Sequence, residues 1–427
     1  MLAGGALTGG AFKLGALKAL DDVLLGRKTT DLDLYVGLSA GALLAAPLAA
    51  GVGPAAMLPS LRGVAGAFTP LQALDLYSPN LAELVAKPLA YLRDLVAYAP
   101  AWARDLVRRS PRLLERIHDP VMAFARAPSR ETAQAILAPL ADALFAAPQL
   151  PSPLAYLPTG LFDNAALERY LRRNLERNGI PNDFRALARQ RGSALYVVAT
   201  DVDTAERVVF GHDENTSLTI SEAVQASTAL PGFYKPARLG GVDYVDGGVR
   251  RTANIDVAIE HGAELIICYN PFRPFSNRAV RHRDPLAAPD RTSAVALTDR
   301  GLLTVLNQVL RTLLHSRLQL GLHQYLEDPR FRGDILLIEP MEEDVTFFEM
   351  APLDFRQRHA AAQHGYVSAT RSLESNHEAI AHVLERHGLG LAQGESRAGA
   401  DRIAAARVPD SGAVASPRAR VRQRRAA

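Results

Sequence analysis

Apolar residues near the start of the chain recur at every third or fourth position, and this spacing predicts a helix over 11–25. The apolar positions are Leu14, Leu17, Leu20 and Leu24. A short apolar run at 34–36 then ends at a glycine and predicts a strand, and the small residues of 42–50 predict a second helix. A loop, helix, strand, turn and helix in this order are typical of an α/β fold.

The same alternation returns after residue 158. Periodic segments predict helices over 164–178, 221–230, 255–261, 302–325 and 355–384. Apolar runs predict strands at 194–199, 207–210, 243–245, 265–269 and 335–338.

The segment 54–158 has a different pattern, with helical periods and no convincing strand, and we interpret it as a helical insertion. Pro88 and Pro100 are expected to kink or break its main helix. Its apolar face is expected either to pack on the core or to contact a lipid surface. The uncharged stretch 34–61 reaches the length of a membrane span, but its three prolines and four glycines favour a buried strand, turn and helix.

Composition narrows the class of protein. The chain has 427 residues, 48% of them hydrophobic and 22% charged, which fits a globular fold. Its net charge is +3, but residues 397–427 hold eight arginines and two aspartates, so the rest of the chain is at −3. We therefore expect a disordered, Arg-rich tail over 386–427 and no nucleic-acid partner; like the helical insertion, this tail is a candidate for contact with an anionic membrane.

One cysteine, Cys268, excludes a disulfide framework and a cysteine-ligated zinc site, and indicates a reducing compartment. The start of the chain has no pattern of a secretory signal, so we expect a cytoplasmic protein that is peripheral to a membrane at most. No metal-ligand cluster or nucleotide motif is visible, and we expect neither a metal nor a cofactor.

The strongest candidate for chemistry is a G-x-S-x-G motif at a predicted turn from strand to helix. Gly37 and Gly41 flank Ser39 there. Such a turn is too sharp for larger neighbours, and it exposes the serine as a nucleophile.

Two glycine motifs accompany this serine. Gly4, Gly5, Gly9 and Gly10 open the chain before a helix, where free backbone NH groups suit an oxyanion or a phosphate. A dinucleotide site is the alternative for this loop, although position 6 is Ala and no full strand precedes it. Far downstream, Asp246 follows a short strand and precedes Gly247 and Gly248; such a pair is either a plain turn or a carboxylate fixed within reach of a serine.

Together the three motifs resemble the patatin-like phospholipase family of serine lipid acyl hydrolases. The stretch 226–234 before the aspartate and Ala199-Thr200-Asp201 also resemble the family. The resemblance implies a three-layer α/β/α domain over 1–385 that contains the helical insertion. It also implies a Ser-Asp dyad that cleaves the ester bonds of lipids without a cofactor.

The resemblance carries over to individual positions. Ser39 would be the nucleophile, Asp246 its base, and the backbone NH groups of Gly4, Gly5, Ala6 and Ala40 the oxyanion donors. An isolated aspartate is a weak base near neutral pH, so it needs an apolar pocket.

The opening loop departs from the family pattern, because Ala6 replaces a glycine and Thr8 a common basic residue. A register one residue later, ending on Gly10, stays open. Only three residues precede the loop, which is short for a strand, so we expect a longer natural start.

Two other functions remain open at this stage. The first is a catalytically silent lipid-binding or scaffold protein of the same fold. The second is a soluble esterase with a Ser-Asp-His triad, whose histidine would follow Asp246 in the chain. The candidate histidines are His261, His282, His315, His323, His359 and His364. Lipid class, oligomeric state and physiological role do not follow from the sequence.

Overall fold

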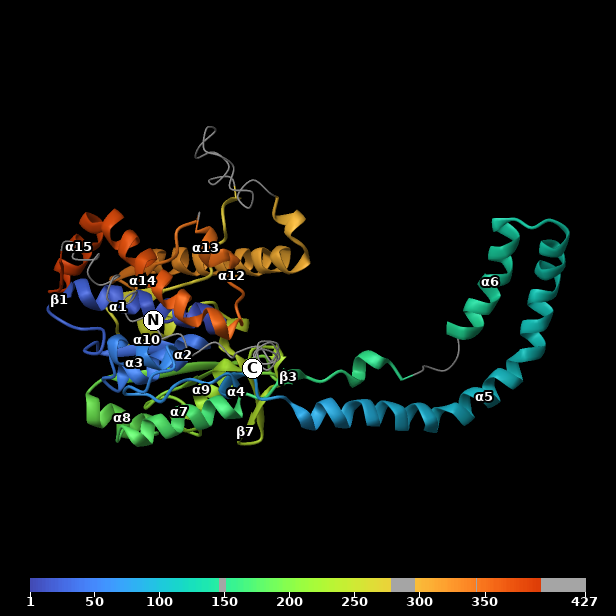
Figure 1. Cartoon of the computed structure of the whole chain (residues 1–427), viewed down its shortest axis with the longest axis horizontal. Helices are drawn as coiled ribbons and strands as arrows, with labels where there is room; N and C mark the ends of the chain where they lie inside the picture. Colours follow the sequence, from blue (N-terminus) through green and yellow to red (C-terminus); the bar gives the residue numbers. More distant parts are fainter. Residues whose placement is uncertain (146–150, 278–295, 343, 393–427) are drawn as a thin grey trace, which may run out of the picture. The chain divides into compact units, whose positions relative to one another are not determined.

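We describe the protein from a computed structural model, which covers residues 1–145, 151–277, 296–342 and 344–392. The chain divides into two compact units (Figure 1). Unit 1 comprises residues 1–78, 164–231 and the chain from 236 onward, and unit 2 comprises 79–163 and 232–235. The alternating elements expected on both sides of the insertion are confirmed.

A mixed β-sheet forms the centre of unit 1. Its strands are β2 (Leu34–Gly37), β4 (Ala194–Asp201), β5 (Arg207–Phe210), β7 (Ala237–Leu239), β8 (Val242–Asp246), β9 (Leu265–Tyr269) and β10 (Asp334–Ile338). β10 runs parallel to β9 and β2 parallel to β4, whereas β5 and β8 both pair antiparallel with β4, and β7 pairs antiparallel with β8. Leu2 bridges Gly37 of β2 and Tyr269 of β9, so the first residues lie between these two strands.

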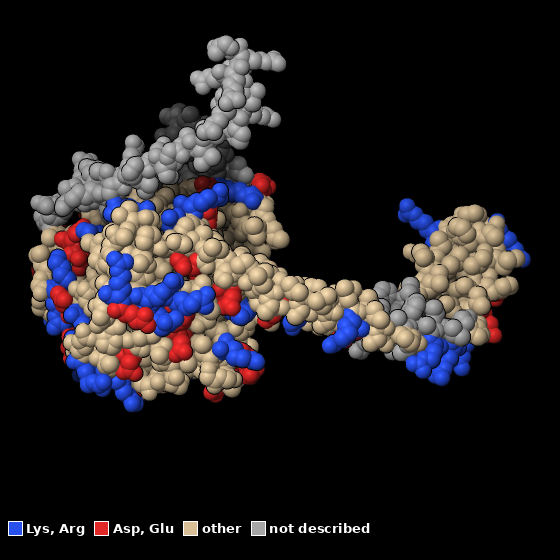
Figure 2. Space-filling model, turned by 60° about the horizontal axis from the view of Figure 1, so that its bottom comes forward, with Lys and Arg blue, Asp and Glu red and all other residues tan. Residues whose placement is uncertain are grey.

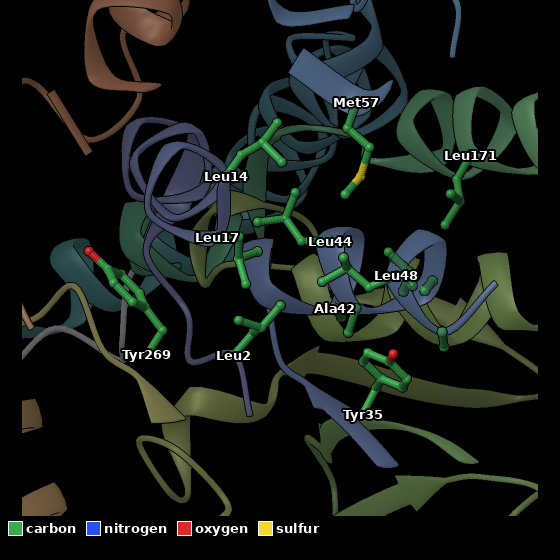
Figure 3. Close-up of a cluster of buried hydrophobic side chains, with 14 of the residues drawn as sticks. Leu2, Leu14, Leu17, Tyr35, Ala42, Leu44, Leu48, Met57, Leu171 and Tyr269 are labelled. Carbon is green, nitrogen blue, oxygen red and sulfur yellow. The ribbon is translucent and has the colours of Figure 1, made fainter. Parts of the chain in front are cut away.

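Helices cover both faces of this sheet. Neighbouring strand residues alternate between two buried clusters: Tyr35 and Val197 belong to one, Val36 and Val198 to the other. This alternation is the period of two that is expected of a strand with both faces buried. Unit 1 is therefore the predicted three-layer α/β/α domain, and Figure 3 shows side chains of the first cluster.

The first cluster receives α1 (Ala6–Val23), α2 (Ala40–Ala49), α3 (Pro54–Leu61), α7 (Ala165–Arg177), α8 (Phe184–Arg191), α9 (Ile220–Thr228) and α14 (Arg358–Ser375). The second receives α10 (Ile255–Glu260) and α12 (Leu302–Glu327). The shorter or peripheral elements are α4 (Ala73–Leu76), α13 (Val345–Glu349), α15 (His377–Arg386) and the pair β1 (Leu24–Leu25) and β11 (Gly390–Leu391).

Two glycines let α1 and α14 approach closely. A Cβ on Gly15 would lie 1.8 Å from the carbonyl oxygen of Ala362, and a Cβ on Gly365 would lie 2.0 Å from that of Phe12. Neither position tolerates a side chain, so α14 is fixed against α1, the helix that begins at the glycine loop.

Unit 2 contains two helices and a small parallel sheet. Its helices are α5 (Leu81–Arg126) and α6 (Arg130–Phe145), and its strands are β3 (Gly160–Phe162) and β6 (Gly232–Tyr234). Among the described residues, no helix has the combination of length and apolar character that crossing a bilayer requires.

Two expectations about boundaries are wrong. The insertion begins at 79 rather than 54, because Met57 and Leu58 of α3 lie in the core of unit 1. Of the kink or break expected at Pro88 and Pro100, the break does not occur, because α5 continues through both residues. A proline removes one backbone donor and bends a helix, but the remaining hydrogen bonds carry α5 onward.

The second boundary is the start of the tail. Residues 386–392 belong to the fold, because Gly390 and Leu391 pair antiparallel with β1 and the NH of Ala392 donates to Val23. The remainder of the expected tail, 393–427, lies outside the described residues.

Candidate active site

Ser39 occupies a strained turn between β2 and α2. Its φ of 55° and ψ of −133° lie in a region that non-glycine residues rarely adopt. A Cβ on Gly37 would lie 2.6 Å from the Cα of Ala42, and one on Gly41 would lie 2.1 Å from the carbonyl oxygen of Leu2. The two glycines of the motif are therefore required by close backbone approach, as the sequence predicted.

Strand β4 brings the candidate nucleophile and base together. Gly37, at the end of β2, pairs with Val197, and Asp246, at the end of β8, pairs with Ala199. The NH of Ala194 donates toward β2 and that of Val202 toward β8. Along a strand, the NH groups of every second residue point to the same edge, and positions 194 and 202 are an even number of residues apart. β2 and β8 therefore pair with the same edge of β4. The end of β2 therefore meets the end of β8, across more than two hundred residues of sequence.

Asp246 is buried and held by backbone groups. Its side chain is 5% exposed, and its Oδ1 accepts a hydrogen bond of 2.8 Å from the NH of Gly248. Its own NH donates to Ala229 over 3.1 Å. A Cβ on Gly247 would lie 2.4 Å from the carbonyl oxygen of Val198, so the Asp-Gly-Gly motif bends where no side chain fits. The carboxylate is thus a fixed group rather than part of a plain surface turn.

Burial changes the chemistry of this carboxylate. Burial raises the pKa of Asp246 from 3.8 to about 6. Three weaker effects act in the opposite direction: the hydrogen bond with the Ser39 side chain, the hydrogen bond from the Gly248 NH and the positive charge of Lys13. A base with a pKa of about 6 is ionised at neutral pH and still accepts a proton effectively. The apolar pocket that an isolated aspartate needs is therefore present.

Ser227 supports the nucleophile turn. Its hydroxyl accepts a hydrogen bond of 2.8 Å from the NH of Ser39 and donates one of 2.6 Å to the carbonyl oxygen of Val198. Ser227 is fully buried on α9. It thereby ties the turn at Ser39 to the middle of β4. No role for Ser227 was predicted beyond its place in the stretch before Asp246.

The glycine loop faces the same serine. A Cβ on Gly4 would lie 3.4 Å from the Cβ of Ser39. Gly5 has a φ of 153° and Ala6 a φ of 50°, so the chain turns sharply into the first turn of α1. Within the described part of the chain, no acceptor pairs with the backbone NH of Gly5, Ala6 or Ala40. Free donors at two helix N-termini suit a developing oxyanion.

Helix α1 begins at Ala6, which resolves the register of the loop. Gly9 and Gly10 lie inside the helix, where the NH of Gly9 donates to the carbonyl oxygen of Gly5 over 2.9 Å. The loop therefore does not extend to Gly10. A Cβ on Gly10 would lie 3.0 Å from that of Ala40, so this glycine lets α1 approach the start of α2.

Lys13 is a charged residue at this site that sequence reasoning missed. It is 0% exposed, and its Nζ donates to the carbonyl oxygens of Ala3 and Gly4, the latter over 3.0 Å. Burial lowers its pKa to about 7, partly offset by the charges of Asp246 and Cys268. Lys13 thus fixes the backbone of the glycine loop through two hydrogen bonds and adds positive charge near the carboxylate of Asp246.

Arg311 of α12 holds the next loop. Its guanidinium donates to the carbonyl oxygens of Pro271 and Arg273 and lies 5.0 Å from the ring centre of Phe347. Pro271 in turn limits the space at Gly5, where an added Cβ would lie 2.8 Å from its Cγ. The glycine loop is therefore supported from two sides.

Three of the candidate histidines have acidic partners elsewhere. His261 lies near Asp213 and Glu214, His315 near Glu339, and His364 bonds to Asp344. None of the described histidines is hydrogen-bonded or ion-paired with Ser39 or Asp246. His282 lies outside the described residues. The described part of the chain also holds no group of three or more residues that could bind a metal ion.

The turn at Ser39, the fixed carboxylate and the free NH groups define a nucleophile elbow on an α/β sheet. Residues 84–259 match the family model of the patatin-like phospholipases. The match includes Asp246, whereas Ser39 and the glycine loop precede it. The match supports the resemblance to this family that the sequence motifs carry.

Among solved structures, the chain is similar to VipD from Legionella pneumophila, with 17% identity and a TM-score of 0.36. The similarity covers 88% of this chain and 66% of that one, so the chain spans slightly less than two thirds of that structure.

Proposed function

We propose that this protein is a lipid acyl hydrolase that cleaves carboxylic ester bonds through Ser39 and Asp246. The observation that carries the proposal is the buried pair itself. A serine at a strained turn is hydrogen-bonded to a carboxylate whose pKa burial raises to about 6. The family supports lipid esters as the substrate class, since a phospholipid or acylglycerol supplies the ester bond.

In the first step, Oγ of Ser39 attacks the ester carbonyl carbon while its proton passes to the Asp246 carboxylate. The tetrahedral oxyanion lies where the NH groups of Gly5, Ala6 and Ala40 can donate to it. The bond to the alcohol then breaks, and the protonated Asp246 returns its proton to the leaving oxygen.

In the second step, water attacks the acyl-enzyme. Asp246 takes the proton of the water, the same NH groups stabilise the second oxyanion, and the bond to Oγ breaks. The proton returns to Oγ of Ser39 and the fatty acid leaves. Every proton transfer uses the one carboxylate, so no third residue is needed.

Lys13 has a positioning role in this proposal. Its two hydrogen bonds fix the carbonyl groups of Ala3 and Gly4, and this fixes the peptide planes whose NH groups follow. A buried positive charge also favours the ionised form of Asp246. Lys13 thereby orients the donors and keeps the base available.

A screen of lipid classes tests the proposal, with wild type compared with Ser39→Ala and Asp246→Asn. We expect hydrolysis of at least one class by the wild type and a loss of at least about a thousandfold in kcat in both variants. Ser60→Ala is the matched control, because Ser60 is equally buried but lies on α3. A fluorophosphonate probe should label Ser39 in wild type.

Three outcomes would contradict the proposal. Folded wild type without an adduct on Ser39 and without hydrolysis would favour the silent lipid-binding protein. A His→Ala variant that loses activity as completely as Asp246→Asn would favour the triad. A preference for short soluble esters with no response to vesicles would favour the soluble esterase.

A further inference from the structure

Helix α5 carries an 11-residue sequence repeat. The four consecutive segments that begin at 81, 92, 103 and 114 are LAELVAKPLAY, LRDLVAYAPAW, ARDLVRRSPRL and LERIHDPVMAF. Their first residues are Leu, Leu, Ala and Leu, and their fifth residues are Val, Val, Val and His. Eleven residues make three turns of 3.67 residues, close to the 3.6 of an unstrained helix. The apolar positions therefore form an almost straight stripe along α5.

The N-terminal half of this stripe is exposed. Leu89 is 60% exposed, Leu92 54% and Val96 72%. Leu81 and Val85, one or two turns earlier, are also exposed. At about 100° per residue these five side chains fall within an arc of about 80°. A continuous apolar surface of this kind normally marks an interaction site.

The chain's own return segment contacts the opposite side of α5. Tyr156 donates to Asp94 over 2.7 Å, its ring centre lies 5.3 Å from that of Tyr91, and Thr159 donates to Glu83. Glu83 and Asp94 lie about 160° to 180° around the helix from the centre of the stripe, and Tyr91 lies about 120° from it. Unit 2 thus satisfies the polar side of this part of α5 and leaves its apolar side open.

The chemistry of α5 favours a lipid surface over a protein groove. α5 contains eight lysines and arginines against five acidic residues, and Figure 2 shows the basic groups of this unit separated by long uncharged stretches. Its four prolines interrupt the backbone hydrogen bonds and bend the helix. A regular coiled-coil seam does not accommodate such bends, whereas a fluid surface does. The charged residues also prevent α5 from crossing a bilayer.

We propose that α5 lies on the surface of an anionic bilayer, with Leu81, Val85, Leu89, Leu92 and Val96 inserted among the acyl chains. The basic residues of its polar side remain among the lipid headgroups. The helix is then an attachment surface that is separate from the catalytic pair. The inference concerns binding alone, so it stands or falls independently of the proposed hydrolysis.

Sedimentation with vesicles tests the proposal in the Ser39→Ala protein, in which hydrolysis cannot alter the lipid. The stripe variant carries Leu89→Gln, Leu92→Gln and Val96→Gln. The control carries Ala86→Gln, Ala90→Gln and Ala97→Gln, three glutamines outside the stripe, about 100° to 140° around the same helix from its centre. On vesicles of phosphatidylcholine and phosphatidylglycerol in equal parts, we expect the stripe variant to lose about a hundredfold in partition constant. The control should bind like its parent, and pure phosphatidylcholine should bind all proteins more weakly.

A fluorescent probe gives a second measurement that does not depend on affinity. Cys268 is the only cysteine and is fully buried, so a dye sensitive to polarity can be placed selectively on Leu92→Cys or Ala90→Cys. Anionic vesicles should shift the emission to shorter wavelength for Leu92→Cys and leave Ala90→Cys unchanged. Circular dichroism checks that each variant keeps its helices.

Equal vesicle binding by the stripe variant and its parent would overturn the proposal. The proposal would also be wrong if wild type ignored vesicles and formed a dimer that the stripe variant converts to a monomer, since a second copy would then cover the stripe. Hydrolysis of a soluble ester, measured with Ser39 intact, should be unaffected by the stripe substitutions. Failure of wild type in that assay would concern the catalytic proposal, not the lipid surface.

Discussion

Replacement of Asp246 by Asn separates a catalytic base from a structural carboxylate. Burial of the ionised group is costly, and this cost is what raises its pKa from 3.8 to about 6. The difference corresponds to about 3 kcal/mol of lost stability. Asn has the same shape and keeps an oxygen that can accept the Gly248 NH. We therefore expect Asp246→Asn to abolish hydrolysis and to stabilise the fold.

The stabilisation has a defined pH dependence. Between pH 4 and 6 the folded protein binds more protons at Asp246 than the unfolded chain does, so wild-type stability falls as the pH rises through this window. The variant lacks this titration. The free energy of unfolding of Asp246→Asn should equal that of wild type below pH 4 and should exceed it by about 3 kcal/mol above pH 6.

Urea denaturation at pH 4, 6 and 8, followed by circular dichroism, measures this difference. Asp243→Asn is the control, because Asp243 lies on the same strand and its hydrogen bond with Arg238 lowers its pKa rather than raising it. A variant that is less stable than wild type at pH 8 would refute the reasoning. So would a variant that keeps its activity.

Three further substitutions test the surroundings of the dyad. Lys13→Met removes a positive charge that lowers the pKa of Asp246. The acid limb of the pH profile of kcat/KM, near pH 6 in wild type, should therefore shift to higher pH. Lys18→Met, at the more exposed lysine of α1, should leave the profile unchanged. Ala6→Gly should raise the free energy of unfolding by about 1 kcal/mol, measured in urea, because it relieves a φ of 50°, and a decrease would contradict the assigned loop conformation. Ser227→Ala should lower kcat about tenfold with little change in KM, since the NH of the nucleophile loses its acceptor; an unchanged kcat would show that the turn is held without it.

The motif glycines were predictable because their constraint is local. Gly37 and Gly41 flank a turn so sharp that a Cβ would collide with nearby backbone, and the spacing of the motif expresses that directly. That Ser39 and Asp246 lie together could not be predicted from such local constraints. It depends on the register of β2 and β8 along one edge of β4, which short apolar runs do not specify.

Lys13 shows what pattern reasoning omits. A lysine in a helix is normally placed in solvent, and its sequence neighbours do not reveal that the carbonyl groups of Ala3 and Gly4 surround it. The predicted start of the insertion was wrong for the opposite reason. Small residues and prolines at 54–61 suggested a new segment, yet Met57 and Leu58 supply core packing. The repeat in α5, by contrast, is visible in the sequence once the period of 11 is measured rather than only the apolar face.

The chain enters unit 2 near residue 80 and returns near residue 160, and these two segments are hydrogen-bonded to each other. The NH of Asn80 donates to Leu161 over 3.0 Å, its side chain donates to Gly160 over 3.1 Å, and Pro79 bridges Phe162. Two chain ends that already meet can be joined by a short turn at little entropic cost. Residues 81–159 are therefore a segment that can be replaced. We expect a variant in which a glycine-rich turn joins Asn80 to Gly160 to keep the proposed hydrolysis and to lose the proposed attachment to lipid, so that the two proposed functions can be changed one at a time.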